Sequence, residues 1–447
     1  MFERGLFVPR PVFPFAPRAL LVATIFAVTA CAQNNVAAPP SEAQAEPAPA
    51  PVVEAPPPEP AKPVLPDVTR VGLMVPLSGS AAALGRDLLD AAQLALFDFK
   101  PEMFELRIYD SGSNPVIAGS AAARAQQDGV QLLLGPLFSG AVTSAANVLR
   151  ADAVPIYAFS SDRLVGGNGV YVAGFFPEAQ IARTVDFAAR RGMFRFASLV
   201  PQDAYGNRMH TAFSDAVLDA GGEITASRFY APSPEEMQQT VRSLARYDER
   251  AAELAREKER LSANDDPISK RALERLETLD TLGDVGFEAL MLPEGGEQIL
   301  QLAPLLAFYD IDPVEVKLLG TWIWDDPSLG KEPSMLGAWF AAPPRASRQR
   351  FVERFRAAYV RAPDRLATLA YDSVALAAVL AQTATPDTPP FTTERLENPE
   401  GYAGVDGIFR MHSSGEVERG LSVLEVTREG PREIDAAPAS FDRSLTN

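Results

Sequence analysis

The most constraining feature of this sequence is an alternation, beginning at Asp67, between short apolar runs and longer segments whose apolar residues recur at helical spacing. The apolar run 71–75 precedes a segment, 84–99, in which apolar residues recur every three or four positions, and a second run follows at 106–109. Parallel strands need a crossover connection, and helices supply it. The alternation therefore predicts an α/β fold in which parallel sheets are flanked by helices.

Two such series follow one another along the chain. The first continues to about residue 159, and the second runs from a predicted helix at 178–191 to an apolar run at 316–319. Residues 67–447 are more than one hydrophobic core usually organises, so we expect two lobes. Ligands of open α/β sheets bind beyond the carboxyl ends of the strands, which places a predicted cleft between the facing loops of the two lobes.

The segment 246–280 interrupts the second series. It is rich in glutamate, arginine and alanine, and residues 264–267 divide it into two parts. Because proline is favoured at the first position of a helix, we expect Pro267 to begin the second helix of a protruding hairpin. Two interpretations stay open. The hairpin is an arm that docks on a partner, or it is a solvated, salt-bridged helix pair that has none.

The first 30 residues have the layout of a signal peptide. Arginines precede an uncharged apolar stretch at 19–30, which is shorter than the roughly 20 residues that cross a bilayer. Its end, Val-Thr-Ala-Cys with the cysteine at Cys31, resembles the lipobox of bacterial lipoproteins. That resemblance implies a lipoprotein signal peptide at 1–30 and lipidation of Cys31. The alternative is an ordinary secretory peptide with an incidental cysteine.

Residues 31–66 are a predicted linker. Eleven of the 30 residues from 37 to 66 are proline, so this segment forms no core and is expected to be an extended spacer. In lipoproteins, a non-acidic residue such as Ala32 after the cysteine goes with sorting to the outer membrane. We therefore expect a periplasmic protein that meets the membrane, the outer one by this rule, only through its lipid anchor.

Composition excludes several classes of function. Lys+Arg 41 against Asp+Glu 58 gives a net charge of −17, which repels nucleic acid. One cysteine and two histidines far apart in the sequence predict no disulfide and no metal site. No glycine-rich nucleotide loop, nucleophile elbow or nucleophile with a recognisable base partner is present, so we expect no catalytic residue, no cofactor and no enzyme activity.

The loops at the predicted strand ends resemble a known family in their order. Pro-Leu-Ser-Gly at 76–79, Gly-Pro-Leu-Phe-Ser at 135–139, Ala-Phe-Ser-Ser-Asp at 158–162, Asp-Ala-Tyr-Gly at 203–206 and Leu-Gly-Thr at 319–321 resemble the type I periplasmic-binding-protein fold. More closely, they resemble the lipoproteins known as penicillin-binding protein activators. The resemblance implies two Rossmann-like lobes joined by three crossovers.

The same resemblance implies where each lobe lies in the chain, with crossovers near Phe176, Ala341 and Thr388. Gly401 to Thr427 is expected to form a hairpin-like addition to the second lobe. The resulting prediction assigns 67–176 and 342–388 to lobe 1, and 177–341 and 389–447, with the helical insertion 246–280, to lobe 2.

In the branched-chain amino-acid binders of this fold, the corresponding loops surround the ligand, and the serine-type loops hold its carboxylate. The carboxylate that clamps the ligand's ammonium group follows the strand matching Leu319-Gly320, where this chain has Trp322. Asp325 and Asp326 lie close enough in sequence to substitute. The other reading of the small polar residues is that they cap helices. The cleft candidates are Ser78, Gly79, Ser139, Ser160, Ser161, Tyr205 and Trp322.

Two functions are consistent with this sequence. The first, implied by the resemblance, is a lipid-anchored regulator of peptidoglycan synthesis that activates a bifunctional penicillin-binding protein by contact, with or without a small-molecule ligand in the cleft. The alternative is the solute-binding receptor of an ABC importer for amino acids or amides.

Overall fold

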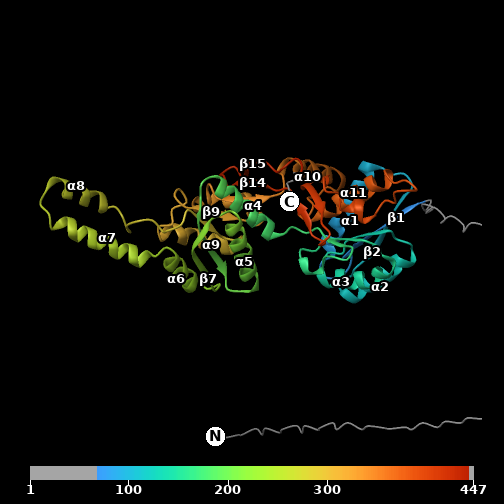
Figure 1. Ribbon diagram of the computed structural model, residues 1–447, viewed down its shortest axis with the longest axis horizontal. Coiled ribbons are helices and arrows are strands. Elements are labelled where there is room, and N and C mark those ends of the chain that lie inside the picture. The colour runs from blue at the N-terminus through green and yellow to red at the C-terminus, as the bar shows by residue number, and fades with distance from the viewer. Residues whose placement is uncertain (1–67, 442–447) are drawn as a thin grey trace, which may run out of the picture. The chain divides into compact units, whose positions relative to one another are not determined.

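The computed structural model describes residues 68–441, and the first part of this range is a five-stranded parallel sheet (Figure 1). The strand order is β2-β1-β3-β4-β5, and every neighbouring pair is parallel. The predicted signal peptide, Cys31 and the linker lie outside the described residues. The strands are β1 (Thr69–Val75), β2 (Phe104–Asp110), β3 (Leu132–Leu134), β4 (Ile156–Ala158) and β5 (Val170–Val172).

Helices cover both faces of this sheet. Side chains alternate along β1, so Leu73 joins a core with α1, α10 and α11, whereas Met74 joins a core with α2 and α3 on the opposite face. This two-sided burial explains why the strands read as continuous apolar runs. The helices are α1 (Ala82–Phe99), α2 (Pro115–Gln127), α3 (Ser139–Leu149), α10 (Arg345–Tyr359) and α11 (Ala367–Gln382).

A second sheet of seven strands forms the other lobe, in the order β15-β14-β10-β9-β8-β6-β7. Strands β6 to β10 are parallel, and β14 and β15 are added antiparallel at one edge. The α/β class with parallel sheets between helices is thus confirmed. The strands are β6 (Arg195–Pro201), β7 (Glu223–Tyr230), β8 (Ala289–Met291), β9 (Lys317–Gly320), β10 (Trp339–Ala342), β14 (Ser422–Glu425) and β15 (Arg432–Asp435).

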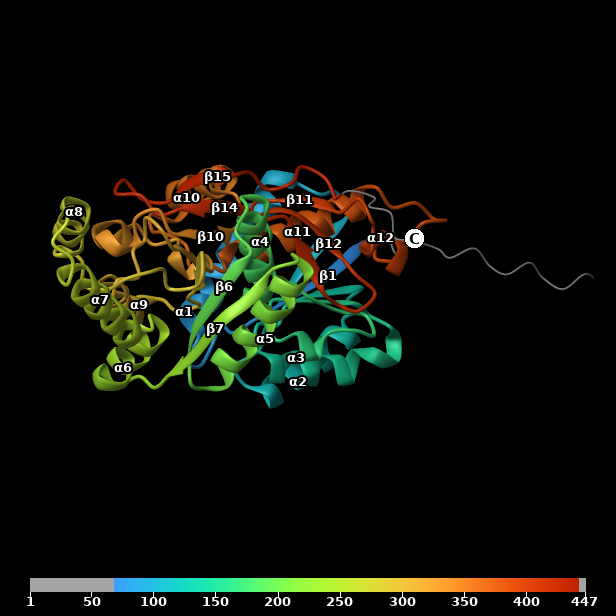
Figure 2. The same ribbon diagram turned by 60° about the vertical axis from the view of Figure 1, so that its left-hand side comes forward.

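The second sheet is also covered on both faces. Helices α4 (Pro177–Arg190) and α5 (Ala204–Asp219) bury one face, and α6 (Pro234–Leu244) and α9 (Gly296–Phe308) bury the other. Figure 2 shows α4 and α5 beside β6 and β7. The two cores of the first lobe share no buried residue with the two cores of the second, so each lobe is packed separately.

The C-terminal region divides between the lobes, which differs from the expectation that 389–447 join the second lobe. A short helix, α12 (Thr393–Leu396), leads into a three-stranded sheet of β11 (Tyr402–Gly404), β12 (Gly407–Met411) and β13 (Val417–Arg419). Its apolar face, which includes Phe409, packs into the core of the first lobe.

Only β14 and β15 extend the second sheet, so the third passage between the lobes lies at 420–421 and not near Thr388. The alternation of apolar residues in β12 predicts a half-buried strand but does not say which lobe covers it. The other two passages lie at 173–176 and 343–344, between β5 and α4 and between β10 and α10.

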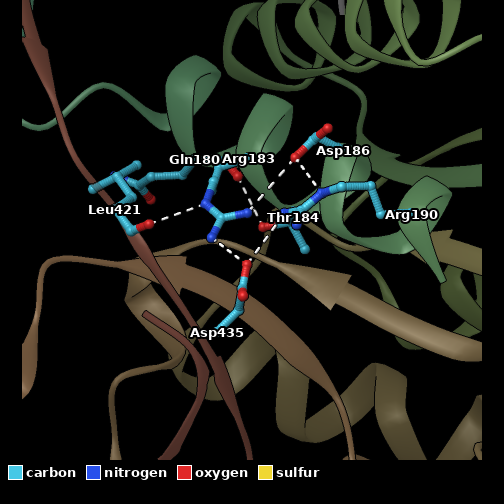
Figure 3. A network of polar contacts seen from close by, with 7 residues as sticks. All are labelled: Gln180, Arg183, Thr184, Asp186, Arg190, Leu421 and Asp435. Carbon is cyan, nitrogen blue, oxygen red and sulfur yellow. Dashed lines mark hydrogen bonds and ion pairs between the residues drawn. The ribbon is translucent and has the colours of Figure 1, made fainter. Parts of the chain in front are cut away.

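Helix α4 holds the C-terminal strands in place through a network of arginine contacts (Figure 3). Arg183 donates from Nε to the carbonyl of Leu421, over 3.0 Å, and from Nη2 to Asp435, over 2.5 Å. Arg190 also reaches Asp435, over 3.1 Å, and pairs with Asp186 within α4. Because Leu421 lies in the third passage, this network fixes the chain where it enters the second sheet.

The segment 246–280 contains the two helices expected from the sequence, α7 (Tyr247–Ser262) and α8 (Pro267–Leu276). They extend away from the second sheet beyond α6 (Figure 1). Arg250 is buried at the base, where it donates to the carbonyl of Gly283 over 2.8 Å and to Asp310 over 2.9 Å. Within residues 68–441 no helix is long and apolar enough to cross a membrane.

Candidate functional site

A cavity of about 510 Å³ lies between the lobes and is lined by residues of both. Four of the seven residues expected from the sequence to bind a ligand line it: Ser139, Ser160, Ser161 and Trp322. Its remaining lining residues are Leu84, Leu137, Phe138, Phe159, Asp162, Gly174, Phe175, Pro177, Arg208 and Leu366.

Serine side chains and a helix end form the polar wall of the cleft. Ser139 is the first residue of α3, and no side chain caps that helix or supplies a negative charge in its first turn. The unsatisfied N–H groups and the positive end of the helix dipole therefore lie at the cavity. Ser160 and Ser161 follow β4, and Ser160 Oγ accepts a hydrogen bond from the Asp162 N–H over 3.1 Å. This wall suits an anionic group.

The opposite wall is aromatic. Trp322 begins a 3₁₀ turn, Trp322–Trp324, and its N–H donates to Gln180 Oε1 of α4 over 2.8 Å. Its ring lies 5.1 Å from that of Phe175, in the first passage between the lobes, at an interplanar angle of 30°. Trp324 instead points into the core of the second lobe, where Nε1 donates to the carbonyl of Glu294 over 2.6 Å. Of these two tryptophans, only Trp322 therefore lines the cleft.

Two charged side chains, one arginine and one aspartate, line the described cleft. Arg208 of α5 lines it and pairs with Glu178, over 3.1 Å. Asp162 is the one acidic side chain among the lining residues of the described cavity, and its Oδ1 is occupied by the N–H of Leu164, over 3.1 Å, as a helix cap. The lining thus offers a guanidinium group that is paired with Glu178, and a carboxylate of which one oxygen caps a turn.

Neither aspartate that was considered as a replacement ammonium clamp is among the residues that line the cleft. Asp325 faces Arg345, with 3.7 Å between the charged atoms. Asp326 caps the following turn by accepting the N–H of Ser328 over 2.8 Å. The position of Trp322 is therefore left without a carboxylate beside it.

The other three sequence candidates lie outside the lining. Ser78 donates its N–H to Asp110 Oδ1 over 3.2 Å, and Gly79 follows in a turn with a φ of 81°, a conformation that favours glycine. The Tyr205 hydroxyl donates to the carbonyl of Pro293 over 3.0 Å, and burial raises the pKa of Tyr205 to about 12. These contacts give all three a structural role in the loops around the cleft.

Ten residues of the lining were not among the sequence candidates, and two of them, Arg208 and Phe175, shape the chemistry of the cleft. Arg208 lies one turn along the helix from the Asp-Ala-Tyr-Gly motif, so helical spacing from Tyr205 was a signal for it. Phe175 lies in a short passage without periodicity, and no local signal identifies it.

An arginine lies behind the aromatic wall. The Arg365 guanidinium carbon is 4.9 Å from the centre of the Trp322 ring and 5.5 Å from that of Phe175. Its nitrogens make no hydrogen bond within the described residues, and Asp406 lies 3.5 Å from Nη1. Burial lowers the pKa of Arg365 from its usual value. This cation adds positive potential to the inner side of the cleft.

Comparison with known proteins identifies relatives of the same architecture. Residues 68–431 match the family described as periplasmic binding protein. One curated relative, an uncharacterised protein of Rickettsia prowazekii, is 21% identical over 176 residues, which are 39% of this chain and 47% of the relative. The match thus spans about half the length of that relative.

Three solved structures illustrate the structural likeness. A protein described as a branched-chain amino acid ABC transporter of Rhodospirillum rubrum aligns with a TM-score of 0.66 at 18% identity, over 82% of this chain and 100% of its own. A solute-binding protein of Rhodopseudomonas palustris in complex with benzoate aligns with a TM-score of 0.52 at 17% identity, over 85% of this chain and 99% of its own. An isoleucine complex of a branched-chain amino acid binding protein from Streptococcus pneumoniae aligns with a TM-score of 0.50 at 17% identity, over 83% of this chain and 100% of its own. These superpositions show a common fold.

Proposed function

Because this chain belongs to the periplasmic binding protein family, we propose that it is a periplasmic solute-binding protein whose cleft takes a small organic anion, and that it acts as the receptor of an ABC importer. This family has a solute-binding fold, so binding and release, with no bond broken, are the expected chemistry. Closure of the two lobes around the ligand would present one surface to the importer.

The pairing of the two cleft walls supports an anion with a flat apolar body. The uncapped start of α3 and the hydroxyls of Ser160 and Ser161 suit a carboxylate, and Arg208, which pairs with Glu178 through Nε, adds further N–H donors. Phe175 and Trp322 offer ring faces on the other side. Benzoate, which the Rhodopseudomonas palustris neighbour holds, is a compound of this class.

An α-amino acid is a poorer fit. An ammonium group in the cleft would lie near Arg208, and Asp162, the lining carboxylate, already caps a turn with one of its oxygens. A buried charge without a full partner costs several kcal/mol, and a cation–π contact with Trp322 returns only about 1–2 kcal/mol. The single observation that carries the proposal is the uncapped start of α3 with two serine hydroxyls facing an aromatic wall in one cleft.

Titration calorimetry tests the proposal with benzoate and leucine as probes. We expect benzoate to bind and leucine to bind at least about tenfold more weakly. Arg208→Met should weaken benzoate about tenfold by removing a charge-assisted contact, whereas Arg256→Met, an exposed arginine on α7, should leave it unchanged. Leucine binding more tightly than benzoate would contradict the proposed ligand class.

A second candidate function is the regulation of peptidoglycan synthesis by contact with a bifunctional penicillin-binding protein. The observation that favours it is the hairpin of α7 and α8, which carries the exposed Ile268, 81% accessible, at the start of α8. Reconstituted polymerisation with a cognate synthase would be faster with this protein than with a variant that lacks 248–280. Equal rates with and without the protein would remove this candidate.

A further inference from the structure

A second cavity, of about 300 Å³, lies within the first lobe and shares no lining residue with the cleft. It is bounded by α1, α10, α11 and the end of β11. A volume of this size is at the lower end of the range for small-molecule sites.

Three aromatic rings form the walls of this cavity. The Tyr371 ring lies 5.3 Å from that of Phe351 and 6.4 Å from that of Phe99, each in an edge-on arrangement. Apolar groups pack well against such rings, and their faces attract cations.

A buried carboxylate also lines this cavity. Asp372 of α11 is 3% exposed, and it accepts N–H groups from Val405 over 2.7 Å and Asp406 over 3.5 Å. No lysine or arginine of the described chain forms an ion pair with it. A buried carboxylate that lacks a cation is costly, and an ammonium group placed beside it would remove that cost.

The charged groups around Asp372 come from four further segments of the first lobe. Asp406, in the turn after β11, and Arg419, on β13, act on it with opposite signs. On α10, Arg354 pairs with Asp98 of α1, which also accepts the Tyr371 hydroxyl over 2.7 Å. The positive charge of Arg354 is therefore already balanced.

Arg350, on α10, is the cation left at the exposed end of the cavity. Its Nη2 donates to Ser347 Oγ over 3.0 Å, and within residues 68–441 it has no carboxylate partner. The cavity thus has a negative group inside, aromatic walls between, and a positive group outside.

We propose that this cavity is a second ligand site that takes a small zwitterion with an apolar chain, its ammonium group beside Asp372 and its carboxylate at Arg350. This site is independent of the cleft, since the two linings have no residue in common. Its ligand would differ from that of the cleft because here a carboxylate lies among aromatic rings, whereas the cleft has serines and an uncapped helix start beside its aromatic wall.

Titration calorimetry of the full chain with ε-aminocaproate, hexylamine and caproate tests this assignment. The titrations are made in the Arg208→Met background, which should weaken anion binding at the cleft. There ε-aminocaproate should bind most tightly, hexylamine more weakly, and caproate should give no heat. Asp372→Asn should weaken ε-aminocaproate by about tenfold or more, and Arg350→Met should weaken it while leaving hexylamine unchanged. Arg256→Met, on α7, is the control without effect.

A steric variant separates binding from folding. Ala375→Leu places extra carbon atoms in the cavity lining without changing any charge, and it should abolish binding of ε-aminocaproate. Thermal unfolding without ligand shows whether each variant is folded, and benzoate binding shows whether its cleft is intact. Caproate binding as tightly as ε-aminocaproate, no heat with any of the three probes, or full affinity in folded Asp372→Asn would overturn the proposal.

Discussion

Ionisation of Asp372 is predicted to make the protein less stable as the pH rises. Burial and the nearby negative charge of Asp406 raise the pKa of Asp372 from 3.8 to about 7. The folded state therefore holds a proton that the unfolded state has released between about pH 4 and pH 7. Since the folded state binds more protons in this range, the free energy of unfolding falls with rising pH and levels off above about pH 7.

The size of the effect follows from the same pKa difference. Each unit of pKa difference corresponds to about 1.4 kcal/mol, so the carboxylate lowers stability at pH 8 by up to about 4 kcal/mol. Asp372→Asn keeps an acceptor for the Val405 N–H and carries no charge. At pH 8 this variant should be about 2–4 kcal/mol more stable than the natural protein, with a much smaller difference at pH 4.

Urea unfolding followed by circular dichroism from pH 4 to pH 8 measures this effect. The quantity to compare is the difference in unfolding free energy between the natural protein and Asp372→Asn, because other titrating groups contribute equally to both. Asp219→Asn, at an exposed carboxylate on α5, is the matched control and should follow the natural protein. A difference that stays constant with pH, or a variant that is less stable at pH 8, would refute the reasoning.

Three further outcomes are expected. Arg183→Met should cost about 1–3 kcal/mol in urea unfolding, because it leaves the Leu421 carbonyl without its donor and Asp435 with Arg190 alone, and a loss no larger than in Arg256→Met would contradict this role. Gly206→Ala should cost about 1–3 kcal/mol of stability and weaken benzoate binding, because the new Cβ would lie 1.9 Å from the Pro201 carbonyl oxygen and push α5 away. The control is Gly119→Ala, whose Cβ would have ordinary contacts and which should be neutral or stabilising. Cys31→Ser should move the protein from the membrane fraction to the soluble periplasmic fraction, and membrane retention of this variant would count against lipidation.

The spacing of apolar residues predicted the longer helices and strands. The apolar run 71–75 lies within β1, and the leucines and alanines of 84–99 are the buried face of α1. Strands β5 and β10 were not predicted, since each follows a short 3₁₀ turn, at 163–165 and 333–335, and so lies outside the alternation of apolar runs with helical segments. Local pattern therefore predicted the fold class but not every strand.

The candidate site was predictable only in part, because side-chain direction in loops depends on contacts that are distant in sequence. Ser160 and Ser161 reach the cleft because β4 ends there. Ser78 follows a strand end in the same way, but Asp110 of the neighbouring strand holds its N–H. The stacking of Trp322 on Phe175 joins residues of different lobes, and no spacing rule relates them.

Long-range contacts also explain why the predicted lobe of the C-terminal strands β11 to β13 was wrong. The sequence of β12 indicates that one face is buried, but the cover comes from Tyr157 of the first lobe, about 250 residues earlier in the chain. The network around Arg183 then ties the next strands to the second lobe. Both sets of contacts are long-range and leave no local signature.

A crystal structure of the protein grown with benzoate tests the central claim most directly. We expect the ligand between the lobes, with its carboxylate at Ser160, Ser161 and the start of α3 and its ring against Phe175 and Trp322. An empty cleft at saturating benzoate, or benzoate bound only elsewhere on the molecule, would contradict the claim.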